Sequence, residues 1–316
     1  MITFDLHEII LTLHLNQRIA ADFHASFLQT TCLPMTLLVR ILSLLPLHLL
    51  HNLGALLGWI IYFCSPTYRR HMQENLALAD VLPVQVRQTA IAEAGKSILE
   101  LPKIWLRPQA EVVGRVVRVT GWDLVESAWR EKDGAILFLT PHLGCFEITA
   151  QYYASHRPIS VLYRPPKQEF LKPLITVGRG ANLKLAAADL GGVRTLMKAL
   201  KRGEAIGMLP DQVPGNGEGI WVPFFGQPAY TMTLAARLAE TGATVLLAYA
   251  ERLLYGAGYH LKLRSLASPL TGTLGERAAQ LNRELEGLIR ECPGQYLWGY
   301  NRYKVPAGAT IPRSQT

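Results

Sequence analysis

From about residue 115 onward, short apolar runs alternate with segments whose apolar residues recur at helical spacing. The apolar runs predict strands at 116–120, 135–140, 159–164, 183–187, 205–209, 244–250 and 260–266. Between them, helical spacing predicts helices near 122–132, 145–155, 167–179, 191–202, 230–241 and 274–291. Strands that alternate with helices in this way predict an α/β fold with a mixed, mostly parallel sheet flanked by helices.

The N-terminal third is dominated by a leucine-rich segment at residues 35–63, MTLLVRILSLLPLHLLHNLGALLGWIIYF. It is long enough to cross a bilayer, but Arg40 and two histidines interrupt it and Pro46 would kink a helix. It therefore fits a single membrane span, an amphipathic anchor in the interface, or a buried core helix. We favour membrane attachment, and Arg69 and Arg70 just after the segment then place the rest of the chain on the cytoplasmic side.

This pattern predicts four consecutive regions. Residues 1–34 lack a basic start and a cleavage site, so they are interpreted as an extension of unclear role and not as a secretory signal. The membrane-anchoring helix follows at 35–70, the main α/β domain covers 71–305, and 306–316 form a tail. A helix within 84–106 is expected to link the anchor to the strands.

Composition excludes several classes of protein. With 49% hydrophobic and 18% charged residues, the chain is neither disordered nor collagen-like. Its formal net charge of +8 and pI of about 9.4 favour an anionic partner, such as nucleic acid, a phospholipid surface or a phosphorylated substrate. The four cysteines have no spacing typical of a disulfide framework or a zinc site, so no metal is expected.

The strongest candidate for catalysis is His142, which follows the predicted strand at 135–140 in the sequence PHLGCFE. Glu147 lies five residues further on, where side chains of one continuous helix are about 140° out of phase. The two can meet only if His142 lies in a turn before the helix, which Gly144 permits. Glu147 would then hold one imidazole nitrogen and leave the other as a general base.

Other interpretations of this motif remain open. His142 can be an ordinary turn residue, with Glu147 favoured at a helix N-terminus by the helix dipole. Cys145 suggests a thiol nucleophile, although a small buried residue is the more common role for cysteine. A metal site built on His142 and Glu147 would lack a second histidine or a thiolate at suitable spacing.

Further candidates follow other predicted strands. Arg164 precedes two prolines at a strand end and could bind phosphate or carboxylate or be a solvated turn residue. Asp211 lies in a turn-forming PDQVPGNG loop that could place it against the site or serve only the turn. Phe224 and Phe225 could line an apolar channel or cap the core. Arg194 begins a series of basic residues that suits either a solvated helix face or anionic headgroups. Aromatic residues are not interleaved with these charges, so nucleic acid is not expected as a partner.

Taken together, these motifs resemble the lysophospholipid acyltransferase superfamily and, within it, the late acyltransferases of lipid A biosynthesis (lauroyl/myristoyl type). The resemblance covers roughly residues 35–305 and includes the leucine-rich entry, RRHMQENLALA, PHLGCFE, LYRPPK, LPDQ, VPFFGQPAYTMTLAARLA and QYLWGYNRYK. Two departures are Tyr300, where family members often have histidine, and the first thirty-odd residues, which have no recognised counterpart.

The resemblance implies an inner-membrane acyltransferase with its catalytic domain on the cytoplasmic face. His142, oriented by Glu147, would deprotonate a hydroxyl of an anionic glycolipid, a lipid A precursor. The hydroxyl would then attack the thioester of acyl-acyl carrier protein without a covalent acyl-enzyme. Candidate substrate-binding residues are Arg164, Asp211, Gln212, Phe224, Phe225 and Arg194.

The implied reaction needs no cofactor, and the expected partners are the carrier protein, the glycolipid acceptor and inner-membrane lipid. Two alternatives remain. One is an acyltransferase for another lysolipid or glycolipid, and the other is a non-catalytic membrane lipid-binding protein.

Overall fold

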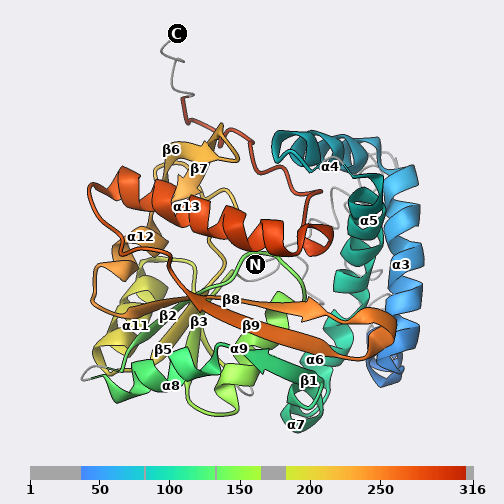
Figure 1. Cartoon of the computed structure of the whole chain (residues 1–316), viewed down its shortest axis with the longest axis horizontal. Helices are drawn as coiled ribbons and strands as arrows, with labels where there is room; N and C mark the ends of the chain where they lie inside the picture. The colour runs from blue at the N-terminus through green and yellow to red at the C-terminus, as the bar shows by residue number, and fades with distance from the viewer. Residues whose placement is uncertain (1–36, 82, 132–133, 165–182, 311–316) are drawn as a thin grey trace, which may run out of the picture.

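A seven-stranded sheet forms the centre of the protein (Figure 1). The computed structural model describes residues 37–81, 83–131, 134–164 and 183–310. The sheet has the order β1-β9-β8-β2-β5-β3-β4, and every neighbouring pair is parallel except β8 with β9. Its strands are Val116–Thr120 (β1), Ile136–Leu139 (β2), Ile159–Tyr163 (β3), Lys184–Ala187 (β4), Ala205–Met208 (β5), Thr244–Arg252 (β8) and Tyr259–Ser265 (β9). The mixed, mostly parallel α/β sheet predicted from the sequence is thus confirmed.

Helices cover both faces of the sheet and form a separate group at one side of it (Figure 1). They are Leu47–Cys64 (α3), Pro66–Leu78 (α4), Val84–Leu99 (α5), Leu101–Leu106 (α6), Gln109–Val113 (α7), Trp122–Arg130 (α8), Phe146–Ala154 (α9), Leu190–Lys201 (α11), Leu234–Ala239 (α12) and Leu274–Glu291 (α13). Short 3-10 helices follow at Leu254–Gly256 (η1) and Pro293–Gln295 (η2). Thr273 and Glu276 form a reciprocal capping box that begins α13.

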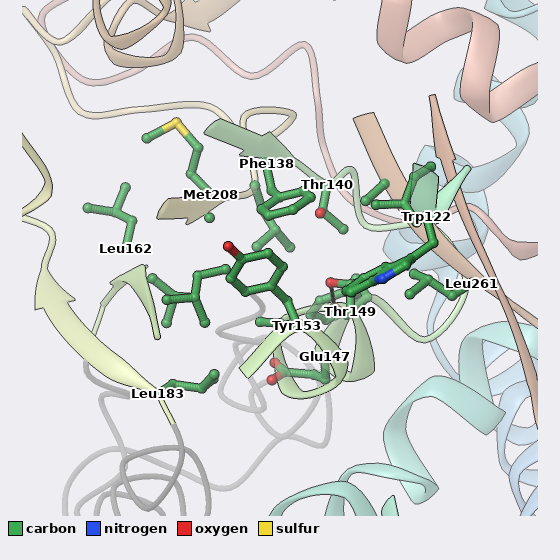
Figure 2. A pocket seen from close by; sticks show the side chains of 18 residues that line it. Trp122, Phe138, Thr140, Glu147, Thr149, Tyr153, Leu162, Leu183, Met208 and Leu261 are labelled. Atoms are coloured by element: carbon green, nitrogen blue, oxygen red, sulfur yellow. Dashed lines mark hydrogen bonds between the residues drawn. The ribbon is translucent and has the colours of Figure 1, made fainter. Parts of the chain in front are cut away.

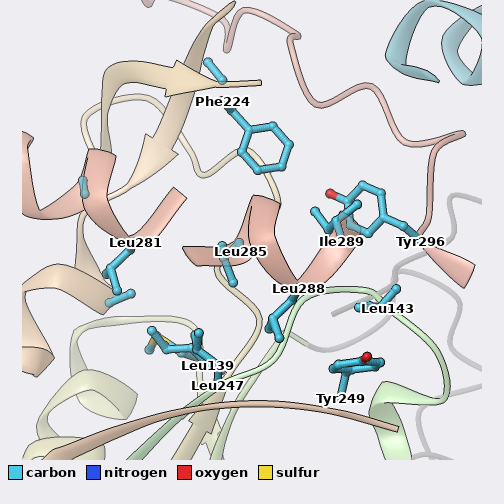
Figure 3. Packing of buried hydrophobic residues seen from close by; sticks show 14 of the residues in the cluster. Leu139, Leu143, Phe224, Leu247, Tyr249, Leu281, Leu285, Leu288, Ile289 and Tyr296 are labelled. Atoms are coloured by element: carbon cyan, nitrogen blue, oxygen red, sulfur yellow. The ribbon is translucent and has the colours of Figure 1, made fainter. Parts of the chain in front are cut away.

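Two hydrophobic cores lie on opposite faces of the sheet, as the alternation of side chains along a strand requires. On β2, Leu137 and Leu139 belong to one core, which α11, α12 and α13 cover (Figure 3). Ile136 and Phe138 belong to the other, which α8 and α9 cover. All four side chains are buried, which explains why a central parallel strand appears in the sequence as a continuous apolar run.

A two-stranded hairpin was not predicted from the sequence. Gly219–Phe224 (β6) and Gln227–Met232 (β7) pair antiparallel across a turn in which Phe225 has a φ of 47°. The helix predicted over 230–241 is therefore wrong at its start, because residues up to Met232 belong to β7 and α12 begins only at Leu234.

Helix α3 packs closely along α5 at three glycines. A β-carbon added to Gly54 would lie 2.6 Å from the Cα of Lys96, and one added to Gly58 or Gly95 would collide with backbone atoms of the facing helix. Only glycine permits this approach of two helix backbones. The segment expected to be an anchor is thus packed against the folded domain along one side.

The other side of α3 is apolar and exposed. Leu56 and Ile60 are 59% and 49% exposed, and Leu49, Leu53 and Phe63 lie on the same side. By length and composition, Leu47–Cys64 could cross a membrane, and a third of it is buried inside the protein; a single such helix is weak evidence for a span. The expected extension at residues 1–34 and the helix predicted at 167–179 lie outside the described residues.

Candidate active site

Two neighbouring parallel strands bring His142 and Asp211 together. In the register of β2 with β5, Leu139 is the partner of Met208. His142 and Asp211 each lie three residues beyond these partners, at the carboxyl edge of the sheet. The carboxyl ends of adjacent parallel strands are the usual place for ligand sites in α/β proteins.

Asp211 holds His142 through two hydrogen bonds. The backbone N–H of His142 donates to Oδ2 of Asp211 at 2.9 Å, and Nδ1 of the imidazole lies 2.8 Å from Oδ1. Burial alone would raise the pKa of the Asp211 carboxyl, but the charge and hydrogen bonds of His142 outweigh it and hold this pKa at about 2. An ionised carboxylate only accepts hydrogen bonds, so Nδ1 carries the hydrogen. In a neutral ring the lone pair then lies on Nε2.

The turn after His142 is held by the C-terminal segment and by β8. Leu297 N–H donates to the carbonyl of His142 at 3.1 Å, and Gly144 N–H donates to the carbonyl of Gln295 at 3.1 Å. Gly144 has a φ of 61°, and a β-carbon there would collide with the carbonyl of Ala250. This turn accordingly requires glycine, as the sequence analysis assumed for the bend before the helix.

Glu147 does not make the contact that the sequence analysis assigns to it. It lies in the first turn of α9, is buried, and accepts a hydrogen bond from Nε1 of Trp105 at 3.3 Å. The carboxylate on Nδ1 of His142 belongs to Asp211 instead, which the sequence analysis had placed among substrate-binding residues. The reason is geometric: Asp211 shares the strand-end position of His142, whereas Glu147 lies beyond the Gly144 turn and is directed into an adjacent cavity (Figure 2).

Cys145 is fully buried behind the turn. Burial, and then the negative charge of Glu100, raises the pKa of its thiol well above the usual value. The thiol therefore stays protonated at neutral pH and is a poor nucleophile.

An apolar cavity lies beside His142, between α9 and the sheet (Figure 2). Its empty space, counting the part that is open to solvent, is about 700 Å³. Phe146 and Thr140 line it, and the ring centroid of Phe146 is 4.9 Å from that of His142. Further lining residues come from α8, α9 and five strands of the sheet: Trp122, Phe138, Glu147, Thr149, Ala150, Tyr153, Ile159, Val161, Leu162, Gly207, Met208, Ala248, Leu261 and Leu263.

The predicted substrate-binding residues are divided between this region and others. Arg164 is exposed just past β3. Burial raises the pKa of the Tyr300 hydroxyl to about 12; the negative charge of Asp211 raises this pKa further, and the positive charge of Arg164 lowers it. Gln212 is half-buried directly after Asp211. Arg194 is exposed on α11, and the described residues show no contact between it and His142.

Phe224 and Phe225 lie elsewhere than expected. Both are buried in the core on the face of the sheet opposite the cavity. Phe224 lies on the side of α13 that faces away from the sheet residues Leu139 and Leu247 (Figure 3). Phe225 N–H donates to Glu286 at 2.7 Å, and the carbonyl of Phe224 accepts from the Tyr303 hydroxyl. Of the two interpretations in the sequence analysis, the structure favours capping of the core.

Tyr296 is a residue of the site that sequence reasoning missed. Its hydroxyl is buried, and burial together with the negative charge of Asp211 raises its pKa well above the usual value. Leu143 and Tyr296 form a bridge between the His142 turn and the C-terminal segment. The QYLWGYNRYK motif was the available signal, since it lies among the motifs that carry the resemblance.

A histidine–aspartate pair at the carboxyl edge of an α/β sheet, next to an apolar cavity, is suited to proton transfer on a substrate with a hydrophobic chain. The family model described as bacterial lipid A biosynthesis acyltransferase matches residues 23–305. The chain belongs to this family and is an acyltransferase.

Several known proteins are similar over most of their length. The lipid A biosynthesis lauroyltransferase of Escherichia coli K12 is 27% identical over 269 residues, which cover 83% of this chain and 87% of the relative. The lipid A biosynthesis palmitoleoyltransferase of the same organism is 27% identical over 229 residues, 70% of this chain and 74% of the relative. A lipid A biosynthesis acyltransferase of Haemophilus influenzae is 27% identical over 291 residues, 86% of this chain and 90% of the relative.

Proposed function

We propose that this protein transfers a fatty acyl chain from acyl-acyl carrier protein to a hydroxyl of a lipid A precursor, with His142 as the general base. The observation that carries the proposal is the pair of hydrogen bonds from His142 to the ionised Asp211. These bonds orient the ring and direct the lone pair of Nε2 away from the carboxylate. That is the arrangement a general base requires.

In the proposed reaction, Nε2 of His142 removes the proton of the acceptor hydroxyl. The oxygen attacks the thioester carbonyl, a carbon–oxygen bond forms and the carbon–sulfur bond breaks. The imidazolium then returns the proton to the departing thiolate, so the enzyme ends in its starting state. Asp211 stabilises the imidazolium while it exists, because its negative charge lies beside Nδ1.

Direct transfer without an acyl-enzyme is supported by the state of Cys145. It is the cysteine nearest to His142 in the chain, and burial keeps its thiol protonated. A buried neutral thiol is a weak nucleophile towards a thioester.

The cavity between α9 and the sheet is proposed to hold the acyl chain of the donor. Its walls are mostly aliphatic and aromatic, and Gly207 of β5 lies in its lining next to Val161 and Ile159. Glu147 lies in the same lining, and we place it in the active site as a carboxylate near the reacting groups and not as the partner of Nδ1.

The anionic acceptor and the membrane account for two further features. Arg164 is proposed to bind a phosphate of the acceptor, which is supported by its exposure and by the effect of its charge on the Tyr300 hydroxyl. Gln212 is proposed to contribute to the same acceptor site. The exposed apolar side of α3 is proposed to lie in the interface of the inner membrane, on the cytoplasmic face, with the net charge of +8 favouring anionic lipid and an acidic carrier protein.

The test is acyl transfer by His142→Ala, with lauroyl-acyl carrier protein as donor. We expect kcat to fall by about 10² to 10⁴, the usual contribution of general-base catalysis. His260→Ala is the matched control, because this histidine also lies near a carboxylate, Glu251, but bonds to Thr120. Turnover of His142→Ala equal to that of the control would refute the role of the base.

The acceptor is tested separately. Purified enzyme is offered a lipid A precursor or lysophosphatidic acid, and lipid A from cells with and without the gene is compared by mass spectrometry. We expect transfer to the lipid A precursor and loss of one acyl chain from lipid A in the cells without the gene. Transfer to lysophosphatidic acid alone would assign the protein to another acceptor class.

A further inference from the structure

A buried ion pair lies directly behind the turn that carries His142. It joins Arg252, the last residue of β8, to Glu100 between α5 and α6, and the two residues are 4% and 1% exposed. Nε of Arg252 donates to both carboxylate oxygens of Glu100 at 2.9 Å, and Nη2 donates to Oε1 at 2.6 Å. The guanidinium is therefore held in one plane and one orientation.

The same Nη2 also donates to the carbonyl of Gly144 at 2.8 Å. Gly144 is two residues after His142 and has the left-handed φ that makes the turn. Cys145 N–H donates to the carbonyl of Ala250, two residues before Arg252, at 2.8 Å. The turn is thus bonded to the end of β8 by its backbone and by the Arg252 side chain.

Glu100 is held by side chains from two further elements. The hydroxyl of Tyr259, the first residue of β9, donates to Oε2 at 2.9 Å, and Nε2 of His51 on α3 lies 3.3 Å from the same oxygen. Burial would raise the pKa of Glu100, but the charge of Arg252 and these bonds lower it to about 2. Glu93 is a second carboxylate near Arg252, 3.4 Å from Nη1, and it also pairs with Lys96.

Stability alone does not explain such a pair. Replacing a buried ion pair by apolar residues of similar size is often neutral or stabilising, because two charges must lose their hydration on folding. An apolar pair, however, cannot donate a hydrogen bond to the Gly144 carbonyl. The distinctive property of Arg252 is a fixed N–H that points at the turn.

We propose that Arg252 is a positioning residue that fixes the His142 turn through the Gly144 carbonyl, with Glu100 fixing Arg252 in turn. This rests on the proposed role of His142 as general base. Through His51, the arrangement also joins α3, the helix with the exposed apolar side, to the turn. Arg252 acts only through the backbone of the turn and touches no reacting atom.

The decisive variant is the double replacement Arg252→Met with Glu100→Leu, which removes both charges together and keeps apolar volume. We expect a folded protein of lower thermal stability, because the Tyr259 hydroxyl and the Gly144 carbonyl lose their partners, with a KM for the acyl donor within twofold and a kcat lower by about 10- to 100-fold. Displacement of a catalytic group by about 1 Å costs up to that factor. A folded double variant with unaltered kcat would overturn the proposal.

Arg252→Lys supplies the test where the double variant does not fold. It keeps a buried positive charge for Glu100, but one ammonium group cannot reproduce the planar set of bonds to Glu100 and Gly144. We expect a kcat about tenfold lower at an unchanged KM, and an unaltered kcat would again overturn the proposal. Tyr259→Phe is the matched control, since it removes one bond to Glu100 and leaves Arg252 bonded to Gly144; its kcat should stay within twofold.

Failure of the Arg252 positioning role can be told apart from failure of the His142 general base. If His142→Ala retains full activity, the general base is wrong whatever Arg252 does. If His142→Ala is inactive and both Arg252 variants turn over normally, only the positioning role is wrong.

Discussion

Replacing Asp211 by asparagine tests the histidine–aspartate pair with the smallest change of shape. The backbone N–H of His142 can only donate, so the carboxamide oxygen must face it. The carboxamide NH₂ then faces Nδ1, which must become the acceptor. The neutral ring is forced into the tautomer with its hydrogen on Nε2, and that nitrogen loses the lone pair that a general base needs.

The size of the effect has two parts. The pKa of Asp211 is about 2 against an ordinary value of 3.8, so its ionised form is favoured in the fold by about 2 kcal/mol. Losing that stabilisation of the imidazolium alone would lower kcat by about 30-fold. The wrong tautomer adds to this, so we expect a total loss of about 10² to 10⁴.

The measurement is kcat at saturating donor and acceptor, together with thermal unfolding. We expect Asp211→Asn to fold, because every hydrogen bond of the native pair retains a donor and an acceptor. Asp123→Asn, an exposed aspartate in the first turn of α8, serves as control. A folded Asp211→Asn enzyme with kcat within threefold of this control would refute the reasoning, and a larger loss in Glu147→Gln than in Asp211→Asn would return the orienting role to Glu147.

Three further predictions follow from the cavity, α3 and the buried carboxyls. Gly207→Val adds volume where a β-carbon alone would lie 3.4 Å from Val161, so transfer of long acyl chains should fall more than transfer of short ones. Equal losses across chain lengths, measured with a series of acyl donors, would contradict the acyl site. The double variant Leu56→Glu with Ile60→Glu should remain folded but no longer sediment with anionic vesicles, and unchanged sedimentation would contradict the interfacial position of α3. The folded pKa values of Asp211 and Glu100 are both about 2, below their ordinary values, so the two ionised carboxylates stabilise the fold fully above pH 5. The free energy of unfolding, measured with urea, should lose this contribution as the pH falls from about 4 to 2. A free energy of unfolding that is unchanged between pH 5 and 3 would contradict it.

The strands and most helices could be predicted because their signals are local. Each buried parallel strand is a short apolar run, and the helices between them have their own spacing. The β6–β7 hairpin lacked such a signal: Pro223 and Pro228 lie opposite each other within it, and proline argues against a strand in sequence analysis. Prolines are tolerated there because the hairpin is a separate two-stranded sheet.

The active site was predicted only in part, because its geometry depends on strand order. His142 was found from its position after β2, which is a local property. Its partner Asp211 follows β5, and β3 and β4 intervene in the chain although β5 lies beside β2 in the sheet. Periodicity does not reveal that order, so the nearest carboxylate in sequence, Glu147, received the role. Arg252 and Glu100 were missed for the same reason, since 152 positions separate them.

If α3 lies in the membrane interface as proposed, the contact of Gly54 and Gly58 with α5 limits how deeply the protein can enter the bilayer. The inner half of α3 is occupied by α5, so lipid can surround only the outer half of a cylinder about 10 Å wide. The domain would then rest on the membrane surface, with the axis of α3 parallel to the plane of the lipid headgroups. An acceptor whose sugars lie among those headgroups could be acylated while its own chains stay in the bilayer.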